Sequence, residues 1–144
     1  MSERFQIGSH QVWFEADVGL VCHSYRGVVR EDEMEEVFDV TLRLVEAATP
    51  LAPPFLLTDG RNATLLSAGA RRVMGQRAKT IREGYCAVYG TSFGLRAILN
   101  LVFKAQSLAS PGLVTWFAAD EAAARVWLTQ RRGKYLREHY GNSL

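Results

Sequence analysis

Short β-rich runs alternate along this chain with stretches of helical periodicity, and this alternation constrains the fold more than any other feature of the sequence. In the helical stretches, apolar residues recur at spacings of three and four, which places them on one face of a helix. Helices are predicted at 31–48, 67–82, 92–108 and 120–137. Strands are predicted at 11–16, 20–26, 55–59, 85–89 and 113–117. The resulting order, ββαβαβαβα, is typical of an α/β fold.

The connections between these elements predict how the strands pair. A glycine-containing turn at 17–19 joins the first two strands, which favours an antiparallel hairpin. Each later strand follows a helix, and right-handed crossovers make such strands parallel. Gly27 is expected to end the second strand, and residues 60–62 are expected to form a loop. We therefore predict a mixed, mainly parallel five-stranded sheet with four helices, in a single domain over residues 1–144 with its core at about 10–140.

If the strands follow one another across the sheet, right-handed crossovers place every crossover helix on the same face. The other face is then partly bare, unless Trp13, the N-terminal segment or the last helix covers it. The strands contain several aromatic residues, and an aromatic and polar face suits a partner protein or a second copy of the chain better than water. A protein partner or a homodimer is therefore expected. The predicted core residues are Phe38, Leu57, Val88, Leu99, Trp127 and Leu128.

Length and composition place the chain among globular proteins. It has 144 residues, of which 48% are hydrophobic and 22% are charged, and a domain of this size needs no metal or disulfide to fold. No segment reaches the roughly 18 apolar residues of a membrane span. The N-terminus lacks the apolar stretch of a secretory signal. We expect a cytoplasmic protein with no transmembrane segment, and the two cysteines fit that compartment.

Charge is distributed unevenly along the chain. Residues 1–55 carry ten acids and four bases, whereas residues 56–144 carry five acids and thirteen bases. The two halves either complement each other within one fold or leave a basic surface that faces an acidic partner or an anionic membrane. The predicted helix at 67–82 is the most basic element, but it lacks interleaved aromatic residues. No nucleic-acid partner is therefore predicted.

Residues that could carry chemistry are scattered. His10, His23 and His139 show no metal-ligand spacing. Cys22 and Cys86 fall in predicted strands, where a free cysteine behaves as a small hydrophobe. No nucleophile elbow or phosphate-binding loop is present. The sequence therefore predicts no enzyme, no metal site and no cofactor.

Four stretches carry a resemblance to a known family. They are YRG at 25–27 before an acidic helix start, FLLTDGR at 55–61, AVYGTSFGLR at 87–96 and WFAADEAAARVWL at 116–128. In their order and spacing, from about His10 to Leu128, the chain resembles the SpoIIAA-like family, which shares its fold with STAS domains. This resemblance implies a SpoIIAA-like fold and a regulatory module that acts by docking protein partners.

The resemblance also implies a position for a phosphorylation switch. In the anti-sigma antagonists of the family, the regulatory serine follows an aspartate at a strand end. The matching aspartate here is Asp59, but Gly60 follows it, so the usual hydroxyl is missing. Thr64 and Ser67 lie nearby and are the candidate phosphosites, although Ser67 is also a natural helix N-cap.

The candidate binding site follows from the position of the strand ends. In open α/β sheets, ligands bind beyond the carboxyl ends of the parallel strands, where helix N-termini favour anions. The residues predicted at this rim are Asp59, Gly60, Arg61, Asn62, Gly90, Thr91 and Ser92. The alternative is that Asp59 only caps a helix and Arg61 only pairs with a carboxylate.

Two functions remain open at this level. The first is a non-enzymatic binding or regulatory module that docks a protein partner. The second is a small carrier or sensor for an apolar, amphipathic or anionic ligand, with a lipid-like ligand and association with a membrane among the alternatives. The second is favoured by the apolar stretch at 95–108, whose only charges are Arg96 and Lys104. A helix so apolar is expected to be buried or to cover a cavity.

Overall fold

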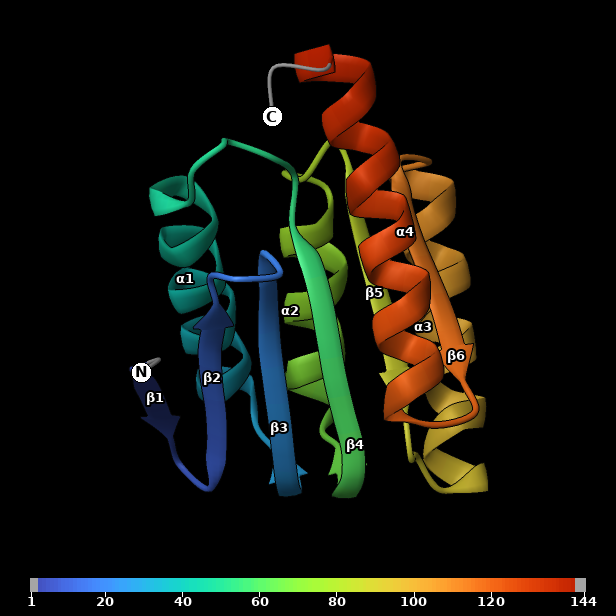
Figure 1. The fold of residues 1–144 in the computed structure, drawn as a ribbon. Helices are drawn as coiled ribbons and strands as arrows, with labels where there is room; N and C mark the ends of the chain where they lie inside the picture. Colours follow the sequence, from blue (N-terminus) through green and yellow to red (C-terminus); the bar gives the residue numbers. More distant parts are fainter. Residues whose placement is uncertain (1–2, 142–144) are drawn as a thin grey trace.

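The computed structural model describes residues 3–141 and contains one six-stranded sheet and four helices (Figure 1). The strands are β1 (Arg4–Ile7), β2 (His10–Glu15), β3 (Leu20–Val29), β4 (Phe55–Leu66), β5 (Gly84–Tyr89) and β6 (Leu113–Ala118). The helices are α1 (Glu31–Ala47), α2 (Ala68–Ala78), α3 (Phe93–Ala109) and α4 (Glu121–Tyr140). The α/β class and the four helices are as predicted.

The strands lie in chain order across the sheet, from β1 to β6. The pairs β1–β2 and β2–β3 are antiparallel, and the pairs from β3 to β6 are parallel. The predicted count of five strands is wrong because β1 precedes the hairpin and pairs with β2. This strand is only four residues long, and only Ile7 in it is buried. Such a short alternating pattern is not recognisable in the sequence.

Two other boundaries differ from the prediction. Residues 60–62 are not a loop, because β4 runs on to Leu66 and pairs with β3 along this stretch. Gly27 does not end β3, which continues to Val29. Instead Gly27 has a φ of 75° and lies between two register shifts of the β3–β4 ladder. A glycine at positive φ here produces a bulge that bends the strands without ending them.

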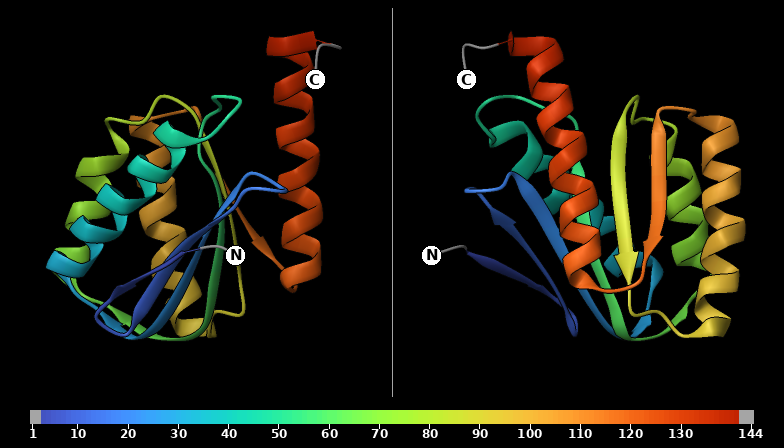
Figure 2. Two further views of the ribbon diagram at one scale, coloured as in Figure 1. Left: turned by 60° about the vertical axis from the view of Figure 1, so that its left-hand side comes forward. Right: turned by 45° about the vertical axis from the view of Figure 1, so that its right-hand side comes forward.

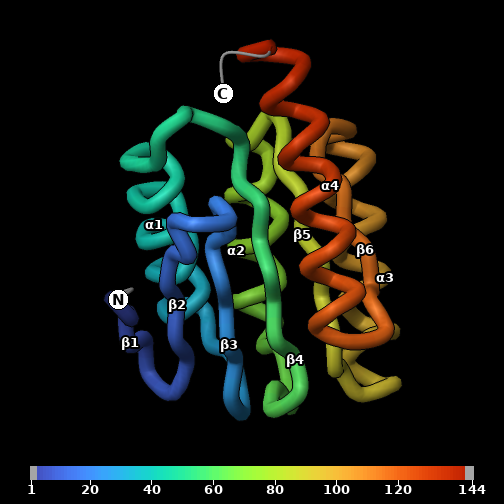
Figure 3. The backbone as a smooth tube through the Cα atoms, in the orientation of Figure 1, coloured from blue at the N-terminus to red at the C-terminus, as the bar shows by residue number. Residues whose placement is uncertain are grey.

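The helices form two layers. Helices α1, α2 and α3 cover one face of the sheet, and α4 covers the other, as the two views of Figure 2 show. The backbone trace in Figure 3 shows α4 crossing in front of β5 and β6. Because no strand follows α4 within residues 3–141, no crossover rule fixes its face. The face that was expected to be partly bare is therefore covered by α4 over its second half.

Apolar side chains fill both interfaces. Between the sheet and α1–α3 lie residues such as Val37, Val73 and Leu99, and between the sheet and α4 lie Phe55, Ala124 and Leu128. Of the six predicted core residues, Leu57, Val88, Leu99 and Leu128 are buried. Phe38 and Trp127 are only half-buried. Trp127 stacks on Trp116 at the sheet edge, and Phe38 lies beneath the guanidinium of Arg77.

The unevenly distributed charges form ion pairs between neighbouring helices. Arg77 of α2 donates to Glu35 at 2.7 Å and to Asp39 at 2.8 Å, both on α1. Arg72 of α2 also pairs with Glu31 at the start of α1. The acidic first helix and the basic second helix therefore complement each other, which favours the first of the two interpretations of the charge pattern.

Candidate functional site

The structure brings most of the predicted rim residues together. A Cβ atom on Gly60 would lie 2.5 Å from Cγ2 of Thr91, and one on Gly90 would lie 2.2 Å from Cγ of Arg61. Gly90 itself has a φ of 79°, so a glycine is needed there for conformation as well as for space. The backbone N–H of Leu95 donates to Ser92 Oγ at 3.2 Å, so Ser92 caps α3. Asn62 lies further along β4, opposite Arg26 of β3.

The charge at this rim is already paired. The Arg61 guanidinium donates from Nε to Asp59 Oδ1 at 3.0 Å and from Nη2 to Asp59 Oδ2 at 2.8 Å. Partial burial opposes ionisation of Asp59, but these hydrogen bonds outweigh it and lower the pKa of the carboxyl. Arg61 is therefore held by a carboxylate, as one of the two interpretations of the sequence expected. Anion binding at the rim stays a prediction.

The two candidate phosphosites lie in different settings. Ser67 caps α2, because its Oγ accepts a hydrogen bond of 3.0 Å from the backbone N–H of Ala70. Thr64 is exposed on β4. Phosphorylation of Ser67 would change an existing cap, whereas Thr64 is accessible as it stands. Phosphorylation of either residue stays a prediction.

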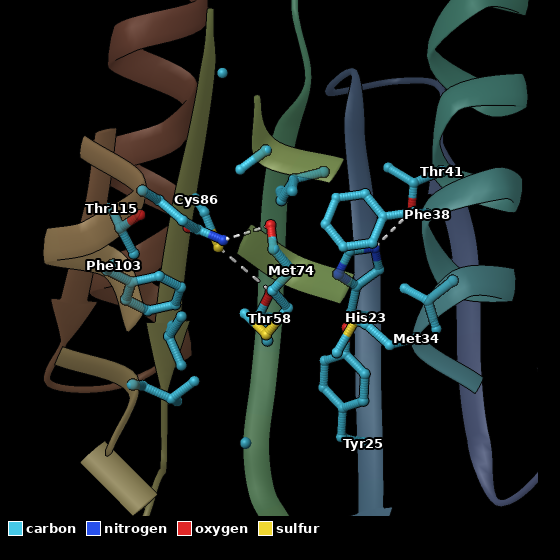
Figure 4. A pocket seen from close by; sticks show the side chains of 18 of the residues that line it. His23, Tyr25, Met34, Phe38, Thr41, Thr58, Met74, Cys86, Phe103 and Thr115 are labelled. Atoms are coloured by element: carbon cyan, nitrogen blue, oxygen red, sulfur yellow. Dashed lines mark hydrogen bonds between the residues drawn. The ribbon is translucent and has the colours of Figure 1, made fainter. Parts of the chain in front are cut away.

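A cavity of about 150 Å³ lies between the sheet and helices α1, α2 and α3 (Figure 4). Its walls come from β3, β4, β5 and β6 and from all three helices. Among the described residues, no aspartate, glutamate, lysine or arginine lines it. Gly60 and Thr91 of the predicted rim line one end of it, so the rim and the cavity are adjacent.

The cavity exists because the sheet presents short side chains where the helices stand above it. Thr58, Cys86 and Thr115 lie on three neighbouring strands, with Cys86 opposite Thr115 in the β5–β6 register. On the helix side, α2 contributes Ala78, a side chain too short to fill the space. An empty cavity of this volume costs about 3–4 kcal/mol at roughly 24 cal/mol per Å³. That is a large part of the ~5–15 kcal/mol by which a domain is usually stable.

Several polar groups face this apolar space. His23 Nε2 and Thr41 Oγ1 share a hydrogen bond of 2.9 Å. Burial lowers the pKa of His23 to about 4, so the imidazole is neutral at pH 7. Gln106 of α3 donates from Nε2 to the carbonyl oxygen of Met74 on α2 at 3.1 Å. These side chains give the cavity hydrogen-bonding groups without giving it a charge.

A thiol also lies on this wall. Thr58 Oγ1 and Cys86 Sγ are 3.6 Å apart on neighbouring strands. Desolvation raises the pKa of the Cys86 thiol to about 11, which keeps it protonated at neutral pH. Because the thiolate is the nucleophilic form, Cys86 is a weakly reactive lining group.

The residues that sequence reasoning considered for catalysis lie apart. His10 is buried at the start of β2, where Nδ1 accepts from the backbone N–H of Arg26 at 3.0 Å and Nε2 lies 3.1 Å from Glu33 Oε1. His139 stacks on Tyr135 near the end of α4. No group of potential metal ligands gathers within residues 3–141. The absence of enzyme activity stays a prediction.

The lining residues His23, Thr41 and Gln106 were not singled out as a site by the sequence. A signal was present, since Thr41 and Gln106 occupy inward positions of helices that are otherwise apolar there. Thr58 likewise interrupts the apolar strand at 55–57. Polar residues at core positions point to a function or to a buried hydrogen bond, but they do not reveal which of them share a cavity.

Comparison with known proteins identifies no family for this chain. No protein-family model matches it, and no curated protein matches it significantly. The SpoIIAA-like resemblance therefore rests on the four sequence stretches and on the order of the elements. Within residues 3–141, no helix has the length and apolar character needed to cross a membrane.

Proposed function

We propose that this chain is a non-enzymatic binding module that holds a small apolar molecule in the cavity between the sheet and α1–α3. The observation that carries this proposal is the cavity itself: about 150 Å³ of space lined by apolar and neutral polar side chains. Ligand cavities in proteins have this composition, with few polar groups among apolar walls. We therefore favour the carrier or sensor function over partner docking.

Energetics support the same function. A cavity that costs about 3–4 kcal/mol when empty is disfavoured unless something offsets that cost. A bound apolar molecule restores the missing van der Waals contacts and leaves water at the same time. The absence of lining charge argues for an apolar ligand and against the anionic ligand that the sequence left open.

We also propose a SpoIIAA-like fold for the chain, with β1 as an addition to the five-stranded pattern. Support comes from the antiparallel β2–β3 hairpin followed by parallel strands with crossover helices on one face. A regulatory role through partner docking is the second candidate function. It is favoured by the outer face of α3, where Phe93 is 91% exposed, Leu108 87% and Leu101 70%.

The ligand proposal is tested by titrating the protein with toluene and following methyl resonances by NMR. Toluene should shift the methyl groups of cavity residues such as Met74 and Leu99, with saturable binding. Thr115→Phe places a ring in the cavity and should abolish these shifts. Thr64→Phe makes the same change at an exposed strand position and should leave them intact. Absence of toluene binding by the wild-type protein, or equal binding by Thr115→Phe, would refute the proposal.

The docking alternative is tested by sedimentation velocity at high micromolar concentration. If α3 joins two copies, the wild-type protein sediments as a dimer and Leu101→Asp as a monomer. A wild-type monomer at all concentrations removes the homodimer from consideration.

A further inference from the structure

Two buried polar side chains in the cavity have unused hydrogen-bonding capacity. His23 is only 6% exposed, and its Nε2 is engaged with Thr41. Its other ring nitrogen, Nδ1, has no hydrogen-bond partner within residues 3–141. Figure 4 shows this second nitrogen on the side of the ring turned toward Thr58 and Met74. Gln106 is 9% exposed and donates from Nε2, while no group of the same residues donates to its Oε1.

No fully buried side-chain nitrogen or oxygen within residues 3–141 lacks a hydrogen-bond partner, so His23 Nδ1 and Gln106 Oε1 are reachable from the cavity space. They are therefore hydrogen-bonding groups that the cavity presents to a water molecule or a ligand. No group within residues 3–141 forms a hydrogen bond with His23 Nδ1, although the cavity lining includes hydroxyl groups such as that of Thr58. A water molecule is stable in a cavity when it has two to four polar partners. A ligand with one hydrogen-bonding group among apolar atoms satisfies the nitrogen and fills the apolar space together.

The volume and the missing charge limit what this ligand is. An engineered protein cavity of about 150 Å³ holds benzene, so the present cavity of about 150 Å³ accommodates roughly one aromatic ring with a small substituent. An ionised ligand would lose its hydration without gaining a counter-charge, at a cost of several kcal/mol. Long acyl chains exceed the space, and carboxylates and phosphates find no cation in it.

We propose that the cavity binds an uncharged, compact aromatic molecule with a single hydrogen-bonding group, such as a phenol or an indole, and that this group bonds to His23 Nδ1. This inference rests on the proposed function and narrows its ligand class. A hydroxyl both donates and accepts, so a phenol satisfies Nδ1 whichever ring nitrogen carries the proton. His23 then positions the ligand, while the surrounding apolar side chains supply the contact area.

Calorimetric titrations with phenol, toluene and benzoate test this inference, because the three probes are similar in size and differ in polarity and charge. Wild-type protein should bind phenol and toluene and show no detectable binding of benzoate. His23→Phe should weaken phenol binding about tenfold and leave toluene within about twofold, since one hydrogen bond is lost. Thr64→Val removes a hydroxyl at an exposed strand position outside the cavity and should leave phenol binding unchanged.

The nitrogen resonances of His23 give an independent measurement on the wild-type protein, whether or not His23→Phe folds. Phenol should move the ¹⁵N resonance of Nδ1, and toluene should not. The inference is overturned if benzoate binds as tightly as phenol, if His23→Phe keeps its phenol affinity, or if phenol binds while the Nδ1 resonance stays in place. In each of these outcomes toluene binding still supports the cavity function, whereas failure of both phenol and toluene to bind rejects the proposed function itself.

Discussion

Acidification should destabilise this protein through one buried side chain. His23 is 6% exposed, and burial lowers its pKa from an ordinary value of 6.5 to about 4. The unfolded chain therefore takes up a proton near pH 6.5 that the folded chain refuses until about pH 4. Stability is fully present above pH 6.5 and falls as the pH drops toward 4. Between pH 7 and pH 5 the free energy of unfolding should fall by about 2 kcal/mol.

The measurement is urea unfolding at pH 7, 6 and 5, followed by far-UV circular dichroism. The control is His23→Phe, which removes the proton uptake and should show about 2 kcal/mol less loss over the same range than the wild-type protein. The Glu15 carboxyl, whose pKa is lowered to about 2 by hydrogen bonding to Arg125, affects stability only at more acidic pH. If wild-type and His23→Phe lose stability in parallel from pH 7 to pH 5, the assignment of a neutral, buried His23 is wrong.

Three further outcomes are expected. Phe55→Ala should cost about 3–5 kcal/mol in urea unfolding, because Phe55 is 1% exposed and stacks on Tyr85 at a centroid distance of 5.0 Å; a loss below about 1 kcal/mol would contradict the packing of α4 on the sheet. Arg61→Ala should leave the melting temperature and toluene binding nearly unchanged, since its guanidinium is exposed and, within residues 3–141, hydrogen-bonds only to Asp59 and lies 5.6 Å from the centre of the Tyr89 ring. Both thiols should react slowly with iodoacetamide at pH 8 and quickly in urea, since burial raises the pKa of Cys22 to about 12 and that of Cys86 to about 11; rapid labelling of the folded protein would contradict this.

The helices and the parallel strands were predictable because each carries a local signal. Ser67, Ser92 and Asp120 stand immediately before α2, α3 and α4, and each side chain accepts a backbone N–H three residues on, as an N-cap does. The apolar stripe of α1 likewise marks its inward face. Such signals depend on neighbours in the sequence and need no knowledge of the tertiary structure.

The features that sequence reasoning missed depend on contacts between distant segments. Nothing local distinguishes a glycine that ends a strand from Gly27, which bends one, because the difference lies in whether β4 continues alongside. The strand β1 is stable only because β2 pairs with it. The side of the sheet on which α4 packs is likewise a tertiary property, since α4 ends the described chain and no later strand constrains it.

The cavity was missed for the same reason, because it too depends on contacts between distant segments. Residues at the rim were predicted because they were expected to follow strand ends in the chain. The strand β4 instead runs on to Leu66, but the structure still brings Gly60 beside Thr91. Volume, in contrast, depends on the sum of many side chains from seven elements. A short residue such as Thr58 or Cys86 is unremarkable on its own strand, and space arises only because Cys86 and Thr115 are neighbours in the register.

The polar residues on the cavity wall also indicate a function for the cavity. A sheet that served only for stability would place larger apolar side chains at Thr58, Cys86 and Thr115, since filled cores are more stable than cavities. It would also avoid His23, whose neutral buried form makes stability depend on pH. Each of these residues lowers stability, and all of them face one space beneath three helices. Residues that individually weaken a core and together line one cavity are most simply explained by what that cavity binds.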